Sequence, residues 1–135
     1  MSIKENIQAF GERLEDVFGE DLNTCGLELK KYGRVGVDEN PVVQAYFTFV
    51  RNDNSGEVTL LYDIKSSLTA VSLILRKGGD EERYGQDSSA LLFSRDITAV
   101  AAGNEKVIQK LSEKEIPVYN RILHYFTLKA PENIF

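Results

Sequence analysis

The chain has 135 residues, of which 42% are hydrophobic and 27% charged, and its formal net charge is −5. These values are typical of one ordered globular domain over residues 1–135 and exclude wholesale disorder. The acidic balance, without a basic patch, disfavours nucleic acid as the main partner. No stretch approaches the roughly 20 apolar residues of a membrane span, so no membrane interaction is expected.

The cysteine count bears on the compartment. Cys25 is the only cysteine, so no disulfide can form within the chain, which fits a reducing environment. The first residues include glutamates where a signal peptide needs an unbroken apolar run. Both observations predict a cytoplasmic protein.

The first predicted element is an amphipathic helix over Ser2–Phe18. Apolar residues recur there at three- and four-residue steps. Ser2 and Glu5 have the spacing of a capping box at its start, and Gly19 is predicted to end it. Gly11 falls in the helix interior, where it marks close packing or a bend.

The middle of the chain predicts an antiparallel sheet. A first strand is expected from Cys25 to Tyr32, followed by a loop from Gly33, although Arg34–Val37 could form a short strand of its own. Val42–Lys77 is rich in β-branched and aromatic residues, and a strong turn signal at Asn52–Gly56 interrupts it. That pattern is typical of a hairpin followed by a third strand.

Two later segments complete the predicted sheet. Leu68–Leu75 fits either a strand or a short helix, and its length and β-branching favour the strand. The polar stretch Lys77–Ser89 is expected to be an exposed loop, and Ala90–Ile97 a further strand. In total, four to six mostly antiparallel strands are predicted between Cys25 and Ile97.

Helices are predicted across Asn104–Thr127, packed on the sheet. Asn104 suits an N-cap, and Pro117 should end the first helix at or before Ile116 because proline disfavours helical backbone in the residue before it. Proline is favourable in a first turn, so a second helix can begin there. The terminal Ile134-Phe135 pair is expected to be exposed. The predicted fold class is therefore α+β, with an N-terminal helix, an antiparallel sheet and a C-terminal helical segment.

Residues able to perform chemistry are scarce. His124 is the only histidine, and Cys25 could act as a nucleophile only if the fold brought His124 to it as a base. One histidine and one cysteine give no metal-ligand spacing. The glycines form no phosphate-binding loop, and Asp80-Glu81-Glu82 lacks the alternation of a calcium loop. We therefore predict no catalytic residue, no metal and no cofactor, and a non-enzymatic role is favoured.

The aromatic residues leave an alternative open. Tyr46 and Tyr62 lie on predicted central strands, and Tyr119 and Tyr125 on the C-terminal helix. If helix and sheet enclosed a cavity, these tyrosines and His124 could serve a small-molecule binding domain or a small enzyme. Core packing is the simpler interpretation.

The charge distribution supplies the favoured functional hypothesis. Residues 1–40 contain nine acidic and five basic side chains, a net of −4 out of the total −5. Such a surface suits a protein partner with a basic surface, as in an inhibitor, immunity protein or accessory chaperone. The polar Gly78–Gln86 segment could supply a second contact. The predicted partner-binding residues all belong to the first helix and the residues after it: Glu12, Glu15, Asp16, Glu20 and Asp21.

A third hypothesis concerns assembly. The apolar face of the C-terminal helix and the Ile134-Phe135 tail could dock the chain as a structural subunit of a larger assembly, or pair two copies as a homodimer.

Overall fold

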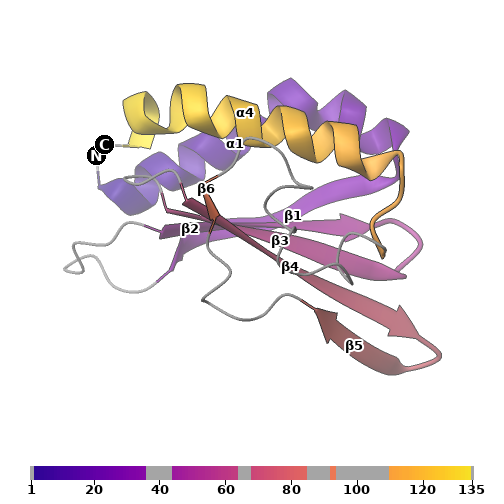
Figure 1. Ribbon diagram of the computed structural model, residues 1–135. Coiled ribbons are helices and arrows are strands. Elements are labelled where there is room, and N and C mark those ends of the chain that lie inside the picture. The colour runs from indigo at the N-terminus through magenta and orange to yellow at the C-terminus, as the bar shows by residue number, and fades with distance from the viewer. Residues whose placement is uncertain (1, 36–43, 64–67, 85–91, 94–109, 135) are drawn as a thin grey trace.

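The computed structural model describes residues 2–35, 44–63, 68–84, 92–93 and 110–134. They form an α+β arrangement in which an N-terminal helix and a C-terminal helix lie side by side on the same face of an antiparallel sheet (Figure 1). The two helices run in opposite directions, so the start of the first lies beside the end of the last. The predicted fold class is confirmed.

Helix α1 spans Ile3–Thr24. Its start follows the predicted capping box: the Glu5 backbone N–H donates to Ser2 Oγ at 3.1 Å, and Ser2 Oγ donates to Glu5 Oε1 at 3.1 Å. Its apolar stripe is buried against the sheet and the second helix, and consists of Ile7, Phe10, Leu14, Phe18 and Leu22.

The predicted end of this helix at Gly19 was wrong. The helix continues for another turn because Leu22 extends the apolar stripe four residues beyond Phe18 and is buried. The chain turns at Gly26, whose φ of +76° is strained for any residue with a side chain. The glycine that follows the end of the helix is therefore Gly26, not Gly19.

Close packing explains Gly11. A Cβ atom built at this position would overlap the ring of Tyr32 on the adjacent strand, so α1 approaches the sheet here more closely than a larger residue permits. The Tyr32 ring is itself held by stacking on Phe47, with 6.3 Å between ring centroids.

We expect Gly11→Ala to destabilise the protein although alanine is the better helix former. Overpacking costs about 1–3 kcal/mol, which exceeds the gain of about 1 kcal/mol from helix propensity. Gly19→Ala is the matched control, because no atom lies within 4 Å of its Cβ position, and it should stabilise. Urea unfolding of both variants, and of Gly11→Ala in a Tyr32→Ala background, measures this. An equal gain in stability from Gly11→Ala and Gly19→Ala would contradict the close approach of α1 to Tyr32.

The sheet is a meander in which each strand pairs with the next along the chain, in the order β1-β2-β3-β4-β5. All pairs are antiparallel. The first five strands are β1 Leu27–Val35, β2 Gln44–Arg51, β3 Gly56–Asp63, β4 Leu68–Lys77 and β5 Asp80–Tyr84. The predicted hairpin between β2 and β3 is confirmed, with a turn in which the Ser55 backbone N–H donates to Asp53 Oδ1 at 2.9 Å.

Strand β1 differs from its prediction at both ends. The expected start at Cys25 falls in the helix-to-strand turn, and the expected loop at Gly33 is instead part of the strand. Gly33 is opposite Tyr46 in the register, and a Cβ atom at position 33 would lie 3.1 Å from the Tyr46 hydroxyl oxygen. The glycine therefore accommodates the tyrosine within the sheet.

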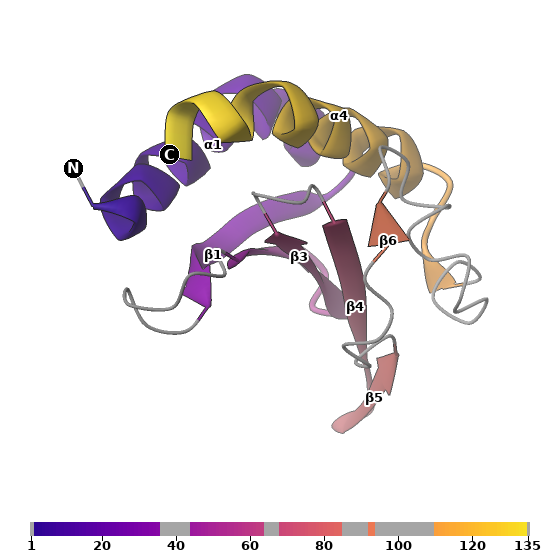
Figure 2. The same ribbon diagram turned by 60° about the vertical axis from the view of Figure 1, so that its left-hand side comes forward.

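The polar stretch after Lys77 was predicted as a loop, and this was wrong for its first half. Gly78 and Gly79 take φ values of +60° and +91° and form a turn, after which β5 pairs with the end of β4. Arg76 of β4 pairs with Glu81 across this hairpin, and it also pairs with Glu57 of β3. Figure 2 shows it extending away from the helices. Residues 85–89 lie outside the described residues.

The preference for a strand at Leu68–Leu75 is confirmed by β4, which runs to Lys77. Of the predicted strand Ala90–Ile97, the structure describes only β6, Leu92–Phe93, which pairs with β4. The predicted helix from Asn104 lies outside the described residues until Lys110.

Helix α4 spans Glu115–Ile134. Pro117 lies in its first turn, as predicted, but the helix continues well past Thr127. The expectation that Ile134 is exposed was wrong: its side chain is buried, and its carbonyl accepts a hydrogen bond from Asn6 Nδ2 at 3.1 Å. Phe135 lies outside the described residues.

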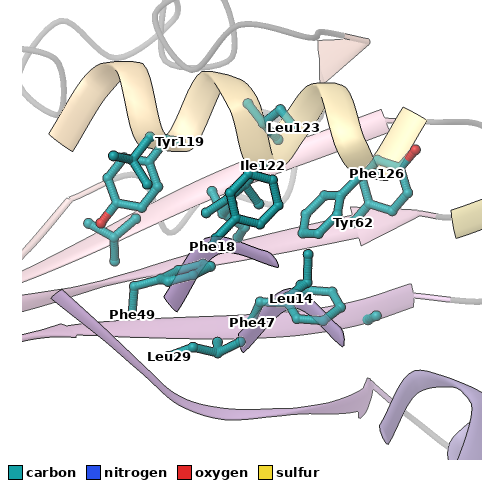
Figure 3. Close-up of a cluster of buried hydrophobic side chains, with 14 of the residues drawn as sticks. Leu14, Phe18, Leu29, Phe47, Phe49, Tyr62, Tyr119, Ile122, Leu123 and Phe126 are labelled. Atoms are coloured by element: carbon teal, nitrogen blue, oxygen red, sulfur yellow. The ribbon is translucent and has the colours of Figure 1, made fainter. Parts of the chain in front are cut away.

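The core fills the space between the helices and the sheet (Figure 3). Alternate residues of β2 and β3 are buried under the helices, because successive side chains of a strand point to opposite faces of the sheet: Ala45, Phe47, Phe49, Val58, Leu60 and Tyr62. Phe126 reaches down from α4 and lies 4.9 Å, centroid to centroid, from the rings of both Phe47 and Tyr62. The helices are therefore joined to the sheet by aromatic packing.

Candidate functional site

The acidic residues predicted to bind a partner divide into two groups. Glu12, Glu15, Asp16 and Glu20 are exposed on α1. Asp21 instead lies toward α4, where its carboxylate pairs with Arg121 at 3.4 Å. The structure therefore keeps four of the five predicted residues available and separates the fifth, which is engaged within the chain.

A fifth carboxylate joins the exposed group from the sheet. Partial burial raises the pKa of the Glu15 carboxyl, and the negative charges of Glu12, Asp16 and Glu28 raise it further because like charges oppose ionisation. Glu28 is exposed on β1. We call Glu15 and the three carboxylates that act on it, Glu12, Asp16 and Glu28, the acidic ridge. Within the part of the chain that the structure describes, none of them has an ion-pair partner.

Sequence reasoning missed Glu28, although a signal was present. Leu27 and Leu29 alternate with it along β1, so the strand period places its side chain opposite the buried leucines. What the sequence could not supply is the position of β1 directly beneath α1.

An open pocket lies beside the ridge. It measures about 320 Å³, and Glu15 and Glu28 contribute to its lining from α1 and β1. Its apolar lining consists of three leucines that are almost fully buried, Leu22, Leu27 and Leu29. The pocket thus combines a small amount of exposed leucine surface with two carboxylates that have no ion-pair partner among the described residues.

A second pocket, of about 410 Å³, lies at the start of α4. Its most unusual feature is a buried ion pair: Arg51 Nε at the end of β2 donates to Glu115 Oε1 at 2.8 Å. Arg51 Nη2 also donates to the Lys110 carbonyl at 3.0 Å. The other carboxylate oxygen of Glu115 is buried and has no hydrogen-bond partner among the described residues.

The sequence also held a signal for this second pocket. Ser112 and Glu115 have the spacing of a capping box, and the Glu115 backbone N–H donates to Ser112 Oγ at 3.2 Å. The Glu115 carboxylate departs from the motif because it is directed to Arg51, 64 residues away in sequence. No local pattern predicts that long-range pair.

Cys25 lines this second pocket but is poorly suited to nucleophilic chemistry. Burial raises the pKa of its thiol, and the Glu115 carboxylate raises it further. The reactive species is the thiolate, so little of it is present at neutral pH. The thiol hydrogen is also engaged, because Cys25 Sγ donates to the Leu22 carbonyl at 3.4 Å.

His124 lies elsewhere. It is exposed on α4 and lines a third pocket with Phe18 and Leu128, whereas Cys25 lines the second. Among the residues that the structure describes, no carboxylate contributes to the lining of the His124 pocket. The two residues that could have formed a nucleophile and base pair therefore face different pockets.

The tyrosines are mainly core residues. Tyr62 and Tyr119 are buried, and Tyr119 packs edge-on against Phe49 at 5.6 Å. Burial raises the pKa of Tyr119 well above its usual range, and Glu115 adds to this. Tyr125 stacks on Phe10 with a centroid separation of 5.6 Å. Tyr46 lies in β2 against Gly33.

Two further observations concern other classes of site. Among the residues that the structure describes, no three His, Cys, Asp or Glu side chains are grouped so as to hold a metal ion. Neither of the two long described helices is apolar enough to cross a bilayer.

No protein-family model, curated protein or solved structure matches this chain.

Proposed function

We propose that the protein is a non-catalytic binding protein whose acidic ridge and adjoining pocket take a basic segment of a protein partner. The observation that supports this most directly is the combination of four carboxylates that have no ion-pair partner among the described residues with an open pocket lined partly by leucines. An inhibitor, an immunity protein or an accessory chaperone would work in this way, and we place the protein in the cytoplasm.

The chemistry of the ridge favours a lysine or arginine side chain as the group that enters. The aliphatic stem of such a residue can pack on an apolar surface while its charged end remains near solvent. Here the stem would contact Leu27 and Leu29, and the cation would meet Glu15 and Glu28. Binding would relieve the mutual repulsion that raises the pKa of Glu15.

The ridge also suits fast association. A cluster of one sign attracts an oppositely charged partner over roughly 8 Å at physiological ionic strength. Most of the effect on affinity at exposed charges is expected in the association rate and its salt dependence.

Reversing Glu12, Glu15 and Asp16 together to lysine should weaken binding of a short arginine- and leucine-containing peptide. We expect slower association and a flatter salt dependence, measured by stopped-flow fluorescence with a labelled peptide. Methyl signals of Leu22, Leu27 and Leu29 should shift on titration with the wild-type protein.

The matched control reverses Asp80, Glu81 and Glu82 to lysine, which changes the net charge equally but lies on the β5 hairpin. It should bind the peptide nearly as the wild type does. Equal losses in both triple variants would show a response to net charge alone, and unchanged binding in the ridge variant would rule out the ridge.

A further inference from the structure

The second pocket, at the start of α4, is built from three separate parts of the chain. Its lining comes from the turn between α1 and β1, the turn between β2 and β3, and the residues that lead into α4. Its volume of about 410 Å³ lies within the range of about 300–1,000 Å³ that is typical of small-molecule sites.

Hydrogen bonds fix the walls of this pocket to one another. The Asn52 backbone N–H donates to the Gly26 carbonyl at 2.9 Å, which joins the two turns. Arg51 donates to the Lys110 carbonyl and to the Glu115 carboxylate, which joins the β2–β3 turn to the start of α4. The pocket is therefore formed before any ligand enters, and binding does not have to order its walls.

Glu115 brings an unsatisfied hydrogen-bond acceptor to the pocket. Its side chain is 4% exposed, and its Oε1 accepts from Arg51. Its Oε2 is buried and has no hydrogen-bond partner among the described residues. The Tyr119 hydroxyl, one helical turn further along α4, is also buried without a partner in that part of the chain. Buried carboxylate oxygens are normally hydrogen-bonded, so the pocket lacks a donor.

The charges of the lining favour an uncharged donor. Arg51 already neutralises Glu115, and the exposed residues Lys110 and Asp53 contribute one charge of each sign, so the formal charges of the lining cancel. A second cation at Glu115 Oε2 would lie next to the guanidinium that shares the same carboxylate. An anion would meet the carboxylate itself. Both contacts between like charges are unfavourable.

The other lining groups favour a hydroxyl as that donor. Asn52, Ser55 and Ser112 all line the pocket, and their side chains can both donate and accept hydrogen bonds. A compound with several hydroxyls matches such a lining because each of its groups also donates and accepts. Among the described residues, no aromatic side chain lines the pocket, so it offers no ring on which a flat heterocycle would stack.

We infer that the second pocket binds a small uncharged polyhydroxy compound of the size of a monosaccharide. One hydroxyl donates to Glu115 Oε2, and its neighbours exchange hydrogen bonds with the side chains of Asn52 and Ser112. This ligand site goes beyond the proposed partner binding and does not depend on it. The pocket beside the acidic ridge shares only Asn52 with it among the described lining residues.

The first test titrates the full ¹⁵N-labelled chain with D-glucose, D-galactose, D-mannose and myo-inositol. At least one of them should shift the backbone amide signals of Gly26, Asn52 and Ser112 and the Arg51 Nε–H signal, with saturation in the millimolar range. D-glucosamine and D-glucuronate carry an ammonium and a carboxylate on the glucose ring. Both should bind at least about ten-fold more weakly than the tightest uncharged probe.

Glu115→Gln should weaken binding of the tightest probe at least about ten-fold, because a hydrogen bond to a charged acceptor is lost. Glu113→Gln is the matched control: it makes the same charge change at an exposed residue outside the lining, and should leave the affinity unchanged. Monodeoxy derivatives of the probe test the same contact in the wild-type chain, so the result does not require Glu115→Gln to fold. At least one of them should lose about ten-fold in affinity, since the missing hydroxyl leaves the carboxylate unpaired.

Four results would each overturn the inference. They are the absence of saturable shifts at the pocket with all four uncharged probes, binding of a charged sugar as tight as that of the best uncharged one, equal affinities in Glu115→Gln and Glu113→Gln, and monodeoxy derivatives that all bind as tightly as their parent.

Discussion

Phe126→Ala is expected to lower the free energy of unfolding by about 4 kcal/mol, in the middle of the range for truncating a buried phenylalanine. The side chain is fully buried, and its ring contacts aromatic rings from three other elements. Centroid distances are 5.9 Å to Phe10, 4.9 Å to Phe47 and 4.9 Å to Tyr62. Removing it opens a cavity where α1, α4 and the sheet meet, and such aromatic surroundings collapse poorly.

Leu128→Ala on the same helix provides the comparison. Its side chain is more than half exposed, so its removal should change stability by no more than about 0.5 kcal/mol. Equilibrium urea unfolding, followed by circular dichroism, measures both variants. A loss of less than about 1 kcal/mol at Phe126 would mean that α4 contributes little to the core.

Arg51→Met is expected to be nearly as damaging, by about 3–5 kcal/mol. The substitution keeps an apolar stem but removes the guanidinium that satisfies Glu115. The Glu115 side chain is only 4% exposed, and its second oxygen already lacks a partner among the described residues. The variant would leave a buried carboxylate without any compensating charge. It would also free the Lys110 carbonyl, so the segment before α4 would lose its tie to β2.

A double-mutant cycle separates the ion pair from simple packing. Replacing Arg51 and Glu115 together by methionine removes both charges, and such replacements are often neutral or stabilising. The double variant should therefore be more stable than Arg51→Met alone, as measured by thermal and urea unfolding. The cycle is completed by Glu115→Met alone. If the losses of stability in Arg51→Met and Glu115→Met add up to the loss in the double variant, the ion pair has no energetic coupling.

The elements with strong periodicity were predictable from the sequence. The stripe of α1 and the alternation of β2 and β3 each show which side chains are buried, because a face that packs on a core must be apolar throughout. The errors lie where a local signal competes with packing. Gly19 resembles a helix end, yet Leu22 provides enough buried surface to continue α1. The acidic residues after Gly79 resemble a loop, yet one of them, Glu81, pairs with Arg76 across a hairpin.

The candidate site was predictable only in part, for a related reason. Exposure of Glu12, Glu15 and Asp16 follows from the helix period alone. The contribution of Glu28 depends on which strand lies under α1, and the pairing of Asp21 with Arg121 depends on how α4 packs beside it. These are contacts between segments far apart in the sequence, and no pattern within either segment encodes them.

The meander has a consequence for the route by which the chain folds. Each of the first five strands pairs with its neighbour along the chain, so assembling this part of the sheet requires only short loops to close, and their entropy cost is small. The contact between the two helices is different, since the hydrogen bond from Asn6 to Ile134 joins residues 128 positions apart. Among the described residues, the contacts between distant parts of the chain are therefore mainly those of the final helix, which docks against both the first helix and the sheet.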